Sequence, residues 1–109
     1  MNEGPFVLPP RYRLLLHGVL NEVLNGFELN DFGTVIGAGE SDLRRLFVSL
    51  DQLPDDVEIR LTFHQTRALR NALRETLREL GEEEFHTRTG VEFEFGESAL
   101  EYLNQLVTT

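Results

Sequence analysis

The sequence predicts a single α+β domain of two imperfect halves, each with a short strand, a long helix, a connecting segment and a shorter helix. Two observations predict it. Apolar residues recur at helical spacing in two long segments. A second pattern occurs twice, 53 residues apart: Phe32 matches Phe85 and Gly37 matches Gly90, since 85 − 32 and 90 − 37 are both 53. We expect the two strands to pair at the centre, with the halves related by a pseudo-two-fold axis. A mostly helical four-helix arrangement is the alternative.

The recurring pattern is Phe-x-Thr-x-x-Gly, which follows a long apolar helix in each half. It occupies residues 32–37 and again residues 85–90. Leucine matches alone are weak evidence, since any two amphipathic helices align their leucines, but this pattern lies outside the helical spacing. It predicts an internal repeat of residues 6–53 and 59–106 within one domain spanning residues 1–109. Two helical hairpins that merely look alike are the alternative.

Length and composition place the chain among ordinary globular domains. It has 109 residues, of which 40% are hydrophobic and 27% are charged. No apolar run approaches the roughly 18 residues that span a membrane. With no cysteine, disulfides and thiolate chemistry are excluded. The first residues lack a basic signal-peptide region, so we expect a cytoplasmic protein without a membrane partner.

The first half begins with a short apolar run, Phe6–Leu8, which indicates a strand. A helix is predicted over 10–25, because apolar residues recur at i, i+3, i+4 and i+7. Gly26 is expected to end it in the left-handed conformation. Residues 32–36 are rich in β-branched side chains, which is typical of a short strand or an ordered loop. A second amphipathic helix is predicted over 41–53.

The second half begins with an alternating apolar and polar stretch, Val57–Phe63, which predicts a strand with one buried face. Thr62 and Gln65 have the spacing of a capping box and predict a helix over 63–80. Gly81 is expected to close that helix.

The last stretch is open to two interpretations. Residues 91–95 alternate as a strand does, and Ser98 and Glu101 have capping-box spacing, which predicts a helix over 99–107. In that interpretation, which we favour, the offset grows to 57. The alternative keeps the offset at 53 and makes residues 91–95 helical. The difference is four residues, about one helical turn, so both keep the apolar stripes facing inward.

The charge of the chain bears on its partners. The chain carries 19 acidic and 10 basic residues, a net charge of −9, which argues against broad nucleic-acid binding and is compatible with a basic protein partner. All ten basic residues are arginine. Four of them share one predicted helix face and form what we call the arginine stripe: Arg67, Arg70, Arg74 and Arg78. The matching first-half positions carry no arginine, so the stripe lies outside the shared pattern.

The arginine stripe has two interpretations. A row of guanidinium groups can bind an acidic segment of a partner protein or a nucleic-acid backbone. Alternatively it is a solvated face whose charges pair internally, as Arg78 and Glu82 would at i,i+4 spacing.

A second candidate site combines His86 and Arg88 with the acidic turn at residues 82–84. Carboxylates beside an imidazole can bind a ligand or a metal, or poise a general base. A solvated acidic turn is the plainer interpretation. No two histidines have metal-ligand spacing, so we predict no metal site, no cofactor and no catalytic residue.

These features predict a small non-catalytic protein-interaction or regulatory module. One alternative is a small-molecule-binding or metal-binding protein, or a small enzyme, that uses the region of His86 and Arg88. Another is an acidic inhibitor of the immunity-protein kind, which rests on size and charge. The expected partner is a protein, and a homodimer is compatible with the sequence.

Overall fold

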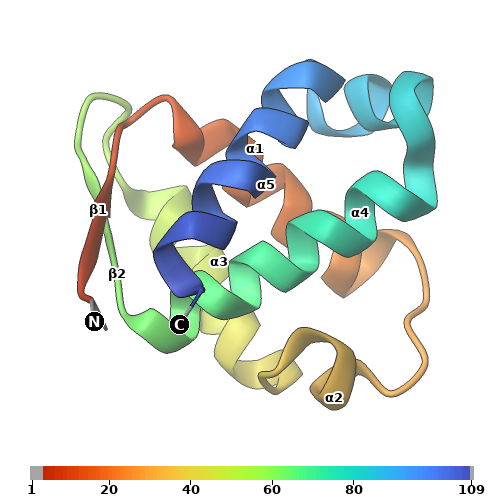
Figure 1. Ribbon diagram of the computed structural model, residues 1–109, viewed down its shortest axis with the longest axis horizontal. Helices are drawn as coiled ribbons and strands as arrows, with labels where there is room; N and C mark the ends of the chain where they lie inside the picture. Colours follow the sequence, from red (N-terminus) through yellow and green to blue (C-terminus); the bar gives the residue numbers. More distant parts are fainter. Residues whose placement is uncertain (1–3, 109) are drawn as a thin grey trace.

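The computed structural model describes residues 4–108 and is 71% helical with a two-stranded sheet. A helix-rich domain with a small sheet is therefore confirmed. The elements in chain order are β1 (Phe6–Leu8), α1 (Tyr12–Asn21), the π-helical turn η1 (Glu22–Gly26), α2 (Phe32–Ile36), α3 (Glu40–Gln52), β2 (Ile59–Leu61), α4 (Phe63–Thr89) and α5 (Phe93–Val107). Both described termini lie at the side of the molecule that carries the sheet (Figure 1).

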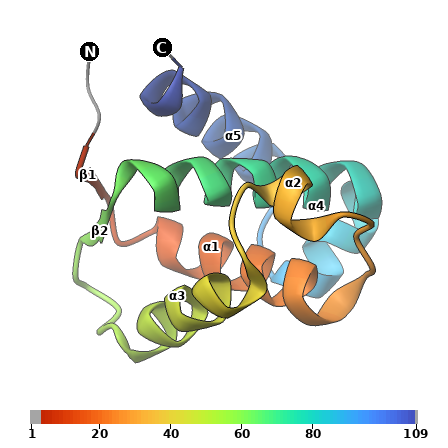
Figure 2. The ribbon, with the colours of Figure 1, turned by 90° about the horizontal axis from the view of Figure 1, so that it is seen from below.

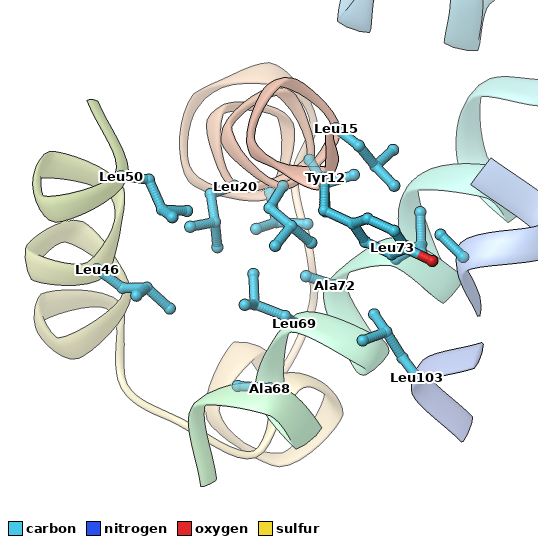
Figure 3. Close-up of a cluster of buried hydrophobic side chains, with 14 of the residues drawn as sticks. Tyr12, Leu15, Leu20, Leu46, Leu50, Ala68, Leu69, Ala72, Leu73 and Leu103 are labelled. Atoms are coloured by element: carbon cyan, nitrogen blue, oxygen red, sulfur yellow. The ribbon is translucent and has the colours of Figure 1, made fainter. Parts of the chain in front are cut away.

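The helices surround one core. Helix α1 packs against α3 and α4, while α2 and α5 pack against α4 (Figure 2). The apolar stripes predicted for the two long helices face each other, and four leucines from them are completely buried (Figure 3): Leu15, Leu20, Leu69 and Leu73. Burial of these side chains is the main favourable term in the stability of a domain of this size.

The sheet consists of β1 and β2 paired antiparallel, with Phe6 opposite Leu61 and Leu8 opposite Ile59. The outer residue pairs bury their side chains, while the central residues Val7 and Arg60 are exposed. This alternation is the one predicted for a strand with one buried face. The two strands begin 53 residues apart, since 59 − 6 is 53.

The capping box predicted at the start of the longest helix is confirmed. The Gln65 backbone N–H donates to Thr62 Oγ1 at 3.0 Å, and the Thr62 N–H donates to Gln65 Oε1 at 2.9 Å. These bonds satisfy N–H groups that the first turn of a helix leaves unpaired. They determine where α4 begins.

Residues 32–36 form helix α2, so the prediction of a strand or loop is wrong. Tertiary contacts overrule the β-branched composition: Ile36 is fully buried, and the Asn71 side-chain N–H of α4 donates to the Ile36 carbonyl at 2.8 Å. Gly37 ends the helix with φ of 85°, and its N–H donates to the Gly33 carbonyl at 2.9 Å.

Residues 93–95 lie in α5, so the predicted strand over 91–95 is wrong, and the helix is longer than the predicted 99–107. Ser98 does not cap it, because it lies inside α5. Ring contacts explain the difference: Phe93 meets Phe85 edge-on at 5.8 Å, and Phe95 meets Tyr12 at 5.5 Å. Helices α3 and α5 begin 53 residues apart, because 93 − 40 is 53, and the 57 offset therefore does not match these helix starts.

Gly81 interrupts α4, because its φ of 72° and ψ of −179° are not helical, so the predicted end of the helical segment after residue 80 is confirmed. A further helical segment then continues to Gly90, where φ is 75°. The left-handed conformation predicted for Gly26 is wrong, because Gly26 does not adopt positive φ. A Cβ atom there would lie 2.3 Å from Glu22 Oε1, so any larger residue would displace the Glu22 carboxylate.

In the described part of the chain, no helix is both long enough and apolar enough to cross a membrane.

Candidate partner-binding surface

The arginine stripe lies on the N-terminal part of α4, before the kink at Gly81. Its neighbours across the surface are α5 on one side and α2 on the other. The Arg70 guanidinium donates to Asn104 of α5, whereas the adjacent Asn71 donates to the end of α2. Helix α4 runs between these two elements (Figure 1). The helix spacing predicted from the sequence therefore brings the four arginines together on one surface.

The two N-terminal arginines of the stripe have no carboxylate partner in the described residues. The Arg67 guanidinium lies 5.7 Å from the centre of the Phe63 ring. Arg70 donates from Nε to Asn71 Oδ1 at 2.8 Å and from Nη1 to Asn104 Oδ1 at 3.1 Å. Amide oxygens hold the guanidinium in place without neutralising its charge.

The two C-terminal arginines share one carboxylate. Glu75 Oε2 lies 3.3 Å from Arg74 Nε and 3.4 Å from Arg78 Nη1, and the Glu75 side chain is only 12% exposed. The expected pairing of Arg78 with Glu82 is not formed, because the Gly81 kink interrupts the helical spacing between them. Four guanidiniums are thus offset by one carboxylate.

The positive charge that remains on this face affects the protonation of Arg70. The pKa of Arg70 is lowered from its usual value, first by burial of its side chain and then by repulsion from Arg74 and Arg67. The guanidinium remains charged at physiological pH because its usual pKa is so high. A bound anion would relieve this repulsion, so the surface is suited to receiving negative charge.

The structure does not bring His86 and Arg88 into one site. His86 Nε2 lies 3.4 Å from Glu92 Oε1, at an open polar cleft of about 340 Å³. Arg88 points elsewhere, because its Nε lies 2.9 Å from Glu22 Oε1 and its Nη2 donates to the Gly26 carbonyl at 3.4 Å. Within the described residues, no group of three potential ligands could hold a metal ion.

Glu22 is the buried charged residue that the sequence analysis missed. Its side chain is 4% exposed, and Oε1 accepts no well-formed hydrogen bond despite its short distance to Arg88. The pair is therefore held by charge attraction rather than by an aligned N–H. One signal was available: Glu22 lies seven residues after Leu15, on the apolar stripe of the helix, where a carboxylate needs a cationic partner.

No protein-family model, no curated protein and no solved structure matches the chain.

Proposed function

We propose that this protein is a non-catalytic interaction module that binds an acidic segment of a partner protein through the arginine stripe of α4. The observation that carries the proposal is the imbalance on this face, where Glu75 pairs with Arg74 and Arg78, while Arg67 and Arg70 have no carboxylate partner among the described residues. Arginine presents planar, forked donors that match carboxylates in pairs. An acidic segment would supply the missing negative charge.

The net charge of −9 does not oppose this assignment at physiological salt. Charges that are exposed and separated by more than about 8 Å are largely screened at about 0.15 M salt. The arginines of the stripe would contact the partner segment directly. Carboxylates elsewhere on the surface would repel it only over longer distances, where salt screens the interaction. Binding should therefore be governed by the local cationic surface, with distant carboxylates slowing the approach of the partner.

The alternative of an enzyme or ligand-binding protein at His86 and Arg88 has weaker geometric support, because these side chains take separate carboxylate partners, Glu92 and Glu22. The alternative of an acidic inhibitor would use the acidic surface rather than the stripe. The arginine stripe distinguishes our proposal from both alternatives, because only our proposal requires these arginines for partner binding.

We also propose that the two halves are copies of one unit related by a pseudo-two-fold axis. A contact between two residues of the first half recurs between the residues that lie 53 positions later in the chain. His17 Nε2 lies 3.1 Å from Asp51 Oδ1, and at the matching positions Arg70 donates to Asn104 Oδ1 at 3.1 Å.

A second pair of contacts supports the same relation. The Asn71 side chain reaches the Ile36 carbonyl, and at the matching positions a Cβ on Gly18 would lie 3.1 Å from Thr89 Cβ. The pairing of β1 and β2 is centred on matching residues, Val7 and Arg60, as a two-fold axis through the sheet requires.

The test of the binding proposal uses a fluorescently labelled oligoglutamate peptide and fluorescence anisotropy. The variant Arg70→Glu/Arg74→Glu should lose binding. The control is Arg44→Glu/Arg45→Glu on α3, which changes the net charge equally, from −9 to −13, since each substitution subtracts two charges. The control should bind almost as the wild type does. Binding should weaken strongly between about 0.15 M and about 1 M salt. Equal binding by the two variants would overturn the assignment.

A further inference from the structure

A cleft of about 280 Å³ lies between α3 and the first turns of α4. Its floor is apolar, with Leu43 and Leu46 from α3 and Ala68 from α4; Figure 3 labels Leu46 and Ala68 on these neighbouring helices. Its rim is polar and is made by five side chains: Asp42, Arg45, Ser49, His64 and Gln65. An apolar floor with a few polar groups at the edge is typical of a ligand site.

The matching space, between α1 and α5, is filled by aromatic rings. Tyr12 is in contact with both Phe95 and Tyr102, at ring-centre distances of 5.5 Å and 5.9 Å. Both contacts are edge-to-face, a favourable arrangement for aromatic rings. Tyr12 is almost completely buried in this cluster. The space between α1 and α5 therefore needs no further side chain to fill it.

The cleft between α3 and α4 lacks all three rings. At the 53-residue offset, the positions of the cluster are held by polar residues without rings: Gln65 for Tyr12, Asp42 for Phe95 and Ser49 for Tyr102. All three line the cleft. Asp42 and Arg45 pair with each other at the rim, outside the apolar floor. The cleft between α3 and α4 thus corresponds to the space that aromatic side chains occupy between α1 and α5.

We propose that the cleft binds the side chain of a tyrosine from a partner protein. A cavity of about 150 Å³ is known to accept a benzene ring, so the cleft has room for one substituted ring. The ring would lie on the apolar floor, and its hydroxyl would reach the polar rim, since a buried tyrosine O–H needs a hydrogen-bond partner. The proposal rests on the pseudo-two-fold relation and is independent of the arginine stripe.

The probes are p-cresol, which is the tyrosine side chain alone, and N-acetyl-tyrosinamide, which adds the flanking peptide groups. Each is titrated into the whole protein while backbone amide shifts are recorded by NMR. Saturable shifts are expected at Leu43, Leu46, Ser49 and Ala68. For a ligand of about eight heavy atoms the dissociation constant should be on the order of millimolar.

Two variants rebuild the aromatic cluster inside the cleft. Ser49→Tyr places a tyrosine where the second half has Tyr102, and Asp42→Phe places a phenylalanine where it has Phe95. Either should weaken p-cresol binding about tenfold or more. Ser49→Tyr should also raise the midpoint of thermal unfolding, because it fills an empty space. The control Ser41→Tyr, on the same helix outside the cleft, should bind p-cresol as the wild type does.

Three results would overturn the proposal. The first is the absence of saturable shifts at the cleft with either probe. The second is binding of p-cresol without binding of N-acetyl-tyrosinamide, which would assign the cleft to a free small aromatic molecule. The third is wild-type affinity in folded Ser49→Tyr and Asp42→Phe proteins, which would place the probe elsewhere. None of these results bears on oligoglutamate binding, so failure here is distinguishable from failure of the arginine stripe.

Discussion

Truncation of Leu20 and Leu73 to alanine tests both the core and the equivalence of the halves. Both side chains have 0% exposure and lie 53 residues apart in the centre of their helices. Each substitution removes about three carbon groups, which corresponds to roughly 2.4 kcal/mol of lost transfer free energy at about 0.8 kcal/mol each. The cavity left behind adds to this loss, so each should cost about 2–5 kcal/mol.

The assay is urea unfolding followed by far-ultraviolet circular dichroism. At a denaturant dependence of about 2 kcal/mol per molar, the middle of the usual range, each variant should lose about 1–2.5 M from its unfolding midpoint. The control is Leu14→Ala on α1, where the side chain is 54% exposed, and its cost should stay below about 1 kcal/mol.

The two core variants should also agree with each other to within about 1 kcal/mol, because matching positions in a two-fold arrangement have similar surroundings. An unchanged midpoint in either variant would refute the burial of that helix face. Costs that differ by several kcal/mol would leave the core intact but would contradict the proposed equivalence of the halves.

Three further predictions concern local structure. Gly37→Ala and Gly90→Ala should each destabilise by about 1–2 kcal/mol in urea unfolding, because both glycines have positive φ, whereas Gly33→Ala inside α2 should not destabilise. Thr62→Ala should cost about 1 kcal/mol by the same assay, since it removes half of the capping box of α4; an unchanged midpoint would mean that the cap is not needed. Burial raises the pKa of Tyr12, so the unfolded chain ionises first and stability should fall as the pH rises above about 10; Tyr12→Phe should flatten that fall, and equal slopes would contradict the assignment.

The arginine stripe illustrates how far sequence reasoning reaches toward a site. Spacings of three and four residues place Arg67, Arg70, Arg74 and Arg78 on one helix face, and the structure has them there. The sequence does not indicate which side chains form hydrogen bonds with these guanidinium groups. Arg70 is held by Asn104, which is 34 residues away in the chain and is brought near only by the packing of α5 on α4. The cleft between α3 and α4 also depends on how helices that are distant in the chain pack together, so the sequence does not indicate it.

The sequence by itself determined the features that depend on neighbours within one or two turns. These are the apolar stripes of α1 and α4 and the cap at Thr62. Their energies arise between residues up to about four positions apart, so the local pattern is sufficient.

Tertiary structure alone decided the state of the short apolar segments. Residues 32–36 and 91–95 have composition and alternation typical of strands, yet Phe32–Ile36 and the segment from Phe93 onward are helical. Ile36 is held by Asn71 from α4, and Phe93 packs on Phe85. A short segment has only a weak intrinsic preference, and burial against distant side chains outweighs it.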